Sequence, residues 1–231
     1  MLIKNLVEMS KYFPSPILEY NGQLFQDAFV DQLLDIDEGF FVDIGAGTGG
    51  VRNQPISFFS NTHYFEKNRD WNGIAIDYDS AYIDFAKDSR KCSCVCADLL
   101  DVNINEVLEK NNCPTIVDYL SFDVDDAQEQ VFDELDFERY KFKVVTFEHD
   151  LFINDGRVLN LHRLSRQKFL SMGYELLLGD ISLEGYGPME DWYINPDFVK
   201  DKNIQNLKLD LWRGGVRDFT PSMLFGKVVI K

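Results

Sequence analysis

The chain has 231 residues, enough for one large domain with a full apolar core. Its 39 acidic residues outnumber its 23 lysines and arginines, which gives a formal net charge of −16 and opposes binding to a nucleic-acid backbone or an anionic membrane. No apolar run reaches the roughly 20 residues of a membrane span, and residues 1–13 lack the apolar core of a signal peptide. We therefore expect a cytoplasmic protein whose partner is a small molecule; the composition does not indicate an oligomeric state.

The first predicted element is an amphipathic helix over residues 23–35, where apolar side chains recur at helical spacing. We assign residues 1–38 to an N-terminal helical extension and residues 39–196 to the main domain. Residues 197–231 form a tail that we expect to pack on the same domain.

The next element is an apolar strand that runs into an acid and then into closely spaced glycines, FFVDIGAGTGG at residues 40–50. Glycine lets backbone amides approach a ligand and takes the turn from strand to helix without steric cost. The pattern predicts a nucleotide-cofactor loop with binding roles for Asp43, Gly45, Gly47 and Thr48.

Two features of this region bear on which cofactor the loop binds. Gly45, Gly47 and Gly50 match the dinucleotide spacing, but the next strand-end acid, Asp77, lies 27 residues beyond Gly50 instead of about 20. Asp43, at the tip of the first strand, would repel a pyrophosphate, whereas it suits a cofactor that carries an ammonium and a sulfonium. The pattern therefore favours S-adenosylmethionine over a nicotinamide dinucleotide.

Three further predicted strands, over residues 73–77, 92–98 and 116–123, also end in an acid. Asp77 is placed to accept the ribose hydroxyls, Asp98 to accept from the adenine amino group with Leu99 beside it, and Asp123 to lie at the reactive end. Taken singly, each acid is as well explained as a helix cap. Ligands of open α/β sheets bind outside the carboxyl ends of the strands, so together these acids predict one cofactor crevice.

The later elements continue the alternation of strands and helices. We predict helices over residues 127–135 and 161–172, and strands over residues 143–148, 173–181 and 191–194. The fold class is therefore α/β, a Rossmann-like, doubly wound and mostly parallel sheet with a C-terminal antiparallel hairpin.

Several stretches together resemble the FkbM-type methyltransferase family, which transfers methyl groups from S-adenosylmethionine, mostly to hydroxyl oxygens of sugars and natural products. They are GQLFQDAFV at 22–30, GFFVDIGAGTGG at 39–50, SNTHYFEKNRDWNGIAID at 60–77, YLSFDVDDAQ at 119–128, FEHD at 147–150 and EDWYINP at 190–196. The resemblance implies a class I methyltransferase domain over residues 39–196 and cofactor roles for Asp43, Gly45, Gly47, Asp77 and Asp98.

The chain departs from the family pattern at two places. Residues 123–128 read DVDDAQ where the family usually has DVEGAE, which alters the substrate or metal details there. An Asp-Tyr pair replaces the common Glu-Pro after the second strand, so Tyr78 is placed to lie against the adenine.

Methyl transfer needs an acceptor oxygen near the methyl carbon and a group that takes its proton. His149, beside Glu148, is the candidate base, because its ordinary pKa is near neutral, and Asp125 is the competing base. Alternatively, Asp123, Asp125, Glu148 and His149 supply ligands to Mg²⁺. Asn61 either binds the cofactor or acceptor or helps to cap the following helix.

These residues predict an S-adenosylmethionine-dependent O-methyltransferase that acts on a hydroxyl of a sugar, glycan or related small metabolite. The altered residues 125–126 motivate an alternative, a catalytically silent cofactor-binding or partner-binding protein of the same fold. The glycine spacing alone supports an NAD(P)-dependent oxidoreductase, which Asp43 opposes.

Overall fold

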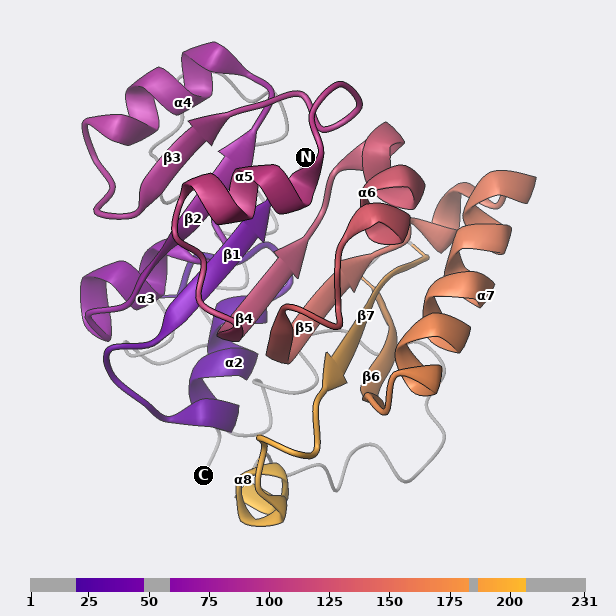
Figure 1. Ribbon diagram of the computed structural model, residues 1–231. Helices are drawn as coiled ribbons and strands as arrows, with labels where there is room; N and C mark the ends of the chain where they lie inside the picture. Colours follow the sequence, from indigo (N-terminus) through magenta and orange to yellow (C-terminus); the bar gives the residue numbers. More distant parts are fainter. Residues whose placement is uncertain (1–19, 48–58, 183–186, 207–231) are drawn as a thin grey trace, which may run out of the picture.

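One seven-stranded sheet organises the chain in the computed structural model, which describes residues 20–47, 59–182 and 187–206 (Figure 1). The strand order is β3-β2-β1-β4-β5-β7-β6. The first five strands in the sequence are parallel, and β7 pairs antiparallel with both β5 and β6. The strands are β1 (Phe40–Ile44), β2 (Asn72–Asp77), β3 (Ser93–Cys96), β4 (Ile116–Phe122), β5 (Lys141–Glu148), β6 (Glu175–Ser182) and β7 (Pro188–Ile194).

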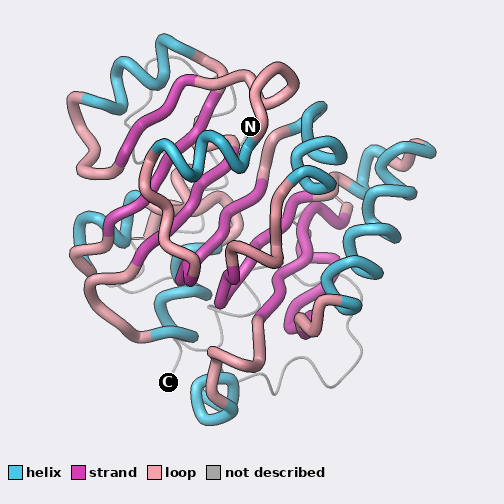
Figure 2. The backbone as a smooth tube through the Cα atoms, in the orientation of Figure 1, coloured by secondary structure: helices cyan, strands magenta, loops and turns pink. Residues whose placement is uncertain are grey.

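Helices cover the sheet on both faces (Figure 2). They are α2 (Gln26–Leu34), α3 (His63–Asn68), α4 (Ser80–Lys87), α5 (Ile104–Lys110), α6 (Gln128–Glu134), α7 (Gly156–Ser171) and α8 (Asp201–Asn206), with short 3-10 turns η2 (Asp125–Ala127) and η3 (Leu151–Ile153). Among the described residues, no helix is long and apolar enough to cross a membrane.

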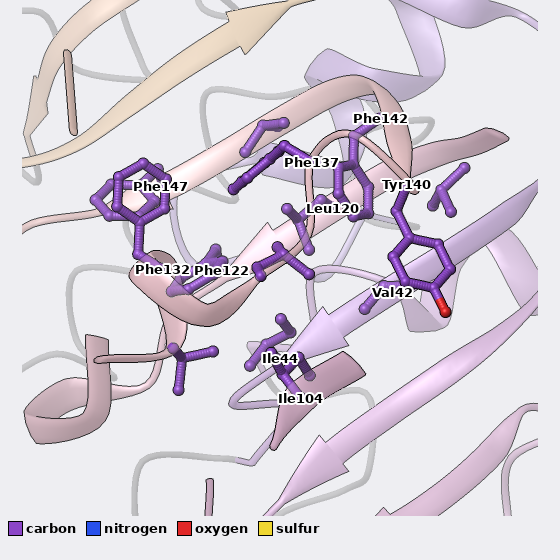
Figure 3. Packing of buried hydrophobic residues seen from close by; sticks show 14 of the residues in the cluster. Val42, Ile44, Ile104, Leu120, Phe122, Phe132, Phe137, Tyr140, Phe142 and Phe147 are labelled. Carbon is purple, nitrogen blue, oxygen red and sulfur yellow. The ribbon is translucent and has the colours of Figure 1, made fainter. Parts of the chain in front are cut away.

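Alternation along the strands divides the core into two clusters. In β1, Phe41 packs into the cluster that contains α2 and α3. Val42 and Ile44 point the other way, into the cluster of α5, α6 and α7 (Figure 3). We call these two sides the α2 face and the α7 face. Which face a strand residue points to decides its role at the ends of the strands.

The fold class predicted from the sequence is confirmed; the structure adds helices α3, α4, α5 and α8, and the predicted elements differ from it mainly at their ends. Helix α7 begins at Gly156, earlier than the predicted residue 161, because the Asp155 side chain accepts a hydrogen bond from the Val158 amide at 2.9 Å and caps the helix. Strand β7 begins at Pro188, before the predicted residue 191.

The N-terminal helix and the first part of the tail pack directly on the main core. Phe29 of α2 lies 4.6 Å, centroid to centroid, from Trp192 of β7. Asn203 of α8 donates a hydrogen bond to the Leu33 carbonyl at 2.8 Å. The tail beyond residue 206 lies outside the described residues.

Candidate functional site

The turn after β1 can be made only with glycine at its first position. Gly45 has φ +83°, and a Cβ there would lie 1.4 Å from the Asp123 carbonyl oxygen. The amides of Gly45 and Ala46 both donate to the Ile76 carbonyl, at 2.9 and 3.0 Å. The turn therefore folds over the end of β2, as the predicted cofactor loop requires. Thr48 lies outside the described residues.

Asp77 stands at the end of β2, directly beside this turn. One carboxylate oxygen accepts from the Gly47 amide and the other from the Asp79 amide, both at 2.8 Å. A Cβ on Gly47 would meet the carboxylate at 2.5 Å, so glycine is needed for this approach. Burial raises the pKa of Asp77. Because each carboxylate oxygen has a second lone pair, this fixed carboxylate can still accept hydrogen bonds from a ligand.

The remaining predicted nucleotide contacts lie at the neighbouring strand end. The Ala97 amide donates to the Asp77 carbonyl at 2.9 Å, which puts Asp98 next to the end of β2. Asp98 is exposed and accepts from the Leu100 amide at 3.0 Å. Tyr78 is 75% exposed, whereas the Leu99 side chain is buried in the core on the α7 face. A contact from Leu99 to the cofactor would therefore have to come from its backbone.

Asp43 is almost fully buried on the α2 face of β1, at 2% exposure. The Thr62 hydroxyl donates to its Oδ2 at 2.6 Å, and Ser121 lies directly opposite it in the β1–β4 ladder. Asn61 donates to the Ser121 hydroxyl at 3.1 Å. Burial raises the pKa of Asp43, opposed by the nearby Arg90 charge and by the Thr62 hydrogen bond.

Two interacting carboxyl groups stand at the ends of β4 and β5. The Asp123 charge opposes ionisation of Glu148, whereas Glu148 lowers the pKa of Asp123. Burial raises the pKa of Asp123 to about 6 and that of Glu148 well above its ordinary value. One member of the pair is therefore placed to accept a proton near neutral pH.

Glu190, to which the sequence analysis gave no role, lies directly opposite Glu148 in the β5–β7 ladder. It accepts from Gln26 Nε2 at 2.7 Å and from Trp192 Nε1 at 2.5 Å. Burial raises its pKa to about 8. Glu190 lies in the EDWYINP stretch that contributes to the family resemblance. Nothing in the sequence around it indicates that its side chain is buried.

His149 does not occupy the place expected of a general base. Its side chain is fully buried; Nδ1 accepts from the Leu151 amide at 3.2 Å, and Nε2 lies 3.6 Å from Asp191 Oδ1. With Nδ1 accepting, the ring proton sits on Nε2, so neither nitrogen has a free lone pair. The physical reason is alternation, because His149 follows Phe147 onto the α7 face while Glu148 points to the α2 face.

The predicted Mg²⁺ ligands are consequently not brought together. His149 lies on the opposite face from Glu148, and Asp125 is exposed at the start of η2, where its φ is +46°. Among the described residues, the group that could hold a metal ion, with all ligand atoms within 4.8 Å of one another, is His149, His162, Asp180 and Asp191. The Arg166 guanidinium already contacts Asp191 twice at 2.6 Å and Asp180 at 2.8 Å, so a cation is present there.

A pocket of about 300 Å³ opens between the end of β5 and the start of α7. Its volume is at the lower end for small-molecule sites. Its acidic lining consists of Asp125, Asp126, Glu129, Glu148 and Asp150, its other polar lining of Gln128 and His149, and its aliphatic lining of Ile153, Val158 and Leu161. Arg157 also lines it and pairs with Asp126 at 2.8 Å. The pocket thus combines hydrogen-bond acceptors with an apolar wall.

Comparisons with known proteins concern the family and the fold. Residues 100–176 match the methyltransferase FkbM domain, a region that includes Asp123 and Glu148 but not the glycine turn or Asp77. No curated protein matches the sequence significantly. A candidate O-methyltransferase from Klebsiella pneumoniae aligns over 84% of this chain and 89% of its own, with 13% identity and a TM-score of 0.53.

A second solved structure, the precorrin-6y C5,15-methyltransferase from Geobacter metallireducens, aligns over 75% of this chain and 90% of its own, with 15% identity and a TM-score of 0.44. The family match covers about a third of the chain, and the first structure shares its fold. The chain therefore has the class I methyltransferase fold, and its residues 100–176 match the methyltransferase FkbM domain.

Proposed function

We propose that this methyltransferase uses S-adenosylmethionine to methylate a hydroxyl oxygen of a sugar, glycan or related small metabolite. The observation that carries the proposal is the glycine turn locked onto Asp77, with the buried Asp43 carboxylate on the strand that leads into it. An ammonium group pairs with such a carboxylate, whereas the pyrophosphate of a nicotinamide dinucleotide is repelled by it.

The residues present fit this cofactor. The missing Cβ atoms of Gly45 and Gly47 leave the backbone open to close approach, and Asp77 has lone pairs for the ribose hydroxyls. Asp98 is exposed at the neighbouring strand end, where it can accept from the adenine amino group. The cofactor supplies a methyl group activated by a sulfonium. The chain's own residues must orient the acceptor and take its proton.

The Asp123–Glu148 pair is the best-placed base. The acceptor hydroxyl would lose its proton to the ionised member of the pair as its oxygen takes the methyl group, whose bond to the sulfonium sulfur would break to leave S-adenosylhomocysteine. Asp125, an exposed carboxylate in the adjoining pocket, is the alternative base.

The pocket chemistry supports a polyhydroxylated acceptor. Carboxylates accept hydrogen bonds from several hydroxyls at once, and the aliphatic wall suits the apolar face of a sugar ring. The same carboxylates repel phosphate groups, which supports a small molecule or glycan rather than nucleic acid or a membrane surface as partner.

Calorimetric titration with S-adenosylhomocysteine, NAD and NADP, each with and without Mg²⁺, tests the proposal. We expect micromolar binding of S-adenosylhomocysteine alone and no requirement for the metal. Transfer of a tritiated methyl group to a panel of sugars then tests the acceptor class. Binding of a nicotinamide nucleotide would support the oxidoreductase, and cofactor binding without transfer to any acceptor would support the silent binding protein.

A further inference from the structure

Thr62 stands at the N-cap of α3 but does not cap the helix. A threonine at this position ordinarily accepts a hydrogen bond from the first helical amides. Here Ser60 accepts instead, from the His63 amide at 3.1 Å. The Thr62 hydroxyl is thereby free for its 2.6 Å bond to Asp43. The Ser-Asn-Thr segment thus assigns the capping role to serine and directs the threonine to the acid before the glycine turn.

The same hydroxyl is approached from the other side by Arg90. Arg90 Nη2 donates to Thr62 Oγ1 at 2.7 Å, and Nε donates to Glu66 at 3.3 Å. The Arg90 side chain is fully buried, and its guanidinium lies 5.5 Å from the centre of the Phe41 ring. Because the arginine can only donate, the Thr62 hydroxyl proton must point to Asp43. The direction of the relay from Arg90 through Thr62 to Asp43 is therefore fixed.

This relay addresses a physical problem of the site. A carboxylate as buried as Asp43 is costly to keep ionised, and only its charged form can pair with an ammonium. Arg90 supplies a positive charge one hydroxyl away without occupying the carboxylate in a direct ion pair. Glu66 holds Arg90 in place and also accepts from the Cys92 amide at 3.1 Å, which ties the relay to the start of β3.

We infer that Thr62 and Arg90 are positioning residues that hold Asp43 as an oriented carboxylate for the ammonium group of the methyl donor. The inference rests on the proposed function, since it names how that site recognises the amino-acid part of S-adenosylmethionine. It also gives a role to Thr62 and Glu66, two residues of the 60–77 segment to which no catalytic role is assigned. Asn61 donates to the hydroxyl of Ser121, which lies opposite Asp43 in the sheet and lowers its pKa.

The test compares two ligands that share the nucleoside and differ in the amino-acid part. S-adenosylhomocysteine carries the ammonium, and 5′-methylthioadenosine lacks it. We expect Thr62→Val to weaken S-adenosylhomocysteine by about tenfold or more, the loss typical of a hydrogen bond to a charged group, while 5′-methylthioadenosine changes by less than about twofold. Thr62→Ser keeps the hydroxyl and is expected to restore binding.

Three results would overturn the inference. Equal weakening of both ligands by Thr62→Val would indicate a structural role only, and unchanged S-adenosylhomocysteine affinity would show no role. A wild-type protein that binds neither ligand would refute the proposed function itself and the inference with it.

A second variant keeps the inference testable if Thr62→Val does not fold. Arg90→Met combined with Glu66→Gln removes both charges of the buried pair together, which avoids an unpaired buried charge. We expect the same selective loss of S-adenosylhomocysteine binding with this double variant. If its affinities for both ligands equal those of the wild type, Arg90 has no positioning role.

Discussion

Replacement of Asp77 by alanine offers the sharpest test of the cofactor crevice. Two backbone amides at 2.8 Å hold this carboxylate in place, so a ligand that binds it does not have to order the side chain. A hydrogen bond to a charged group contributes about 1.5 to 3 kcal/mol. Since about 1.4 kcal/mol is a factor of ten, Asp77→Ala should weaken S-adenosylhomocysteine about 10- to 150-fold.

Calorimetric titration measures this change, and Asp79→Ala is the matched control. Asp79 is two residues away and caps α4 by accepting from the Ala81 amide at 2.9 Å. Its loss should cost about 1 kcal/mol of unfolding free energy and leave cofactor affinity nearly intact. The assignment of Asp77 fails if Asp77→Ala binds like the wild type, or if both variants lose affinity equally.

The remaining predictions concern the base and the folded state. Glu148→Ala should lower methyl transfer and move the acid limb of the rate profile, expected near pH 6, to higher pH, because Asp123 loses a neighbour that lowers its pKa; His149→Gln should keep transfer, and the opposite pattern would restore the histidine as base. Asp191→Asn should cost about 3 kcal/mol in denaturant unfolding, because it removes the buried carboxylate that contacts Arg166 twice, whereas a loss similar to that of the exposed pair variant Asp126→Asn would contradict this. Glu190 keeps its proton in the folded state up to about pH 8 and releases it when unfolded near pH 4.5, so its contribution to the unfolding free energy should fall as pH rises between these values; a flat pH dependence that Glu190→Gln leaves unaltered would contradict this.

The order of strands and helices could be predicted because the signals that fix them are local. Short apolar runs that end in an acid and are followed by turn residues mark parallel strands. The turn after Asp43 requires glycine, because Gly45 has a positive φ and no room for a Cβ. Element ends were less predictable. The start of α7 depends on the Asp155 cap, which precedes the apolar pattern of that helix.

The candidate site was predictable in its strand-end acids and not in its partners. Strand alternation sends neighbouring side chains to opposite faces, so the side chains of Glu148 and His149 leave the end of β5 on opposite sides, although both residues line the same pocket. Arg90 lies in the turn before β3 and reaches Thr62 only through the tertiary fold. Nothing in its own stretch of sequence marks this contact.

The buried acids at this end of the sheet differ in how close each one lies to a positive charge, and this difference accounts for their different roles. Asp191 contacts Arg166 directly, and this pairing lowers its pKa, so it stabilises the packing of α7 as a permanent anion. Asp43 is one hydroxyl away from Arg90 and can remain ionised while offering its charge to a ligand. No described lysine or arginine pairs with Asp123 or Glu148, and burial raises the pKa of both. The acids without a cation are therefore the ones that can exchange a proton near neutral pH, which is the property that methyl transfer to a hydroxyl requires.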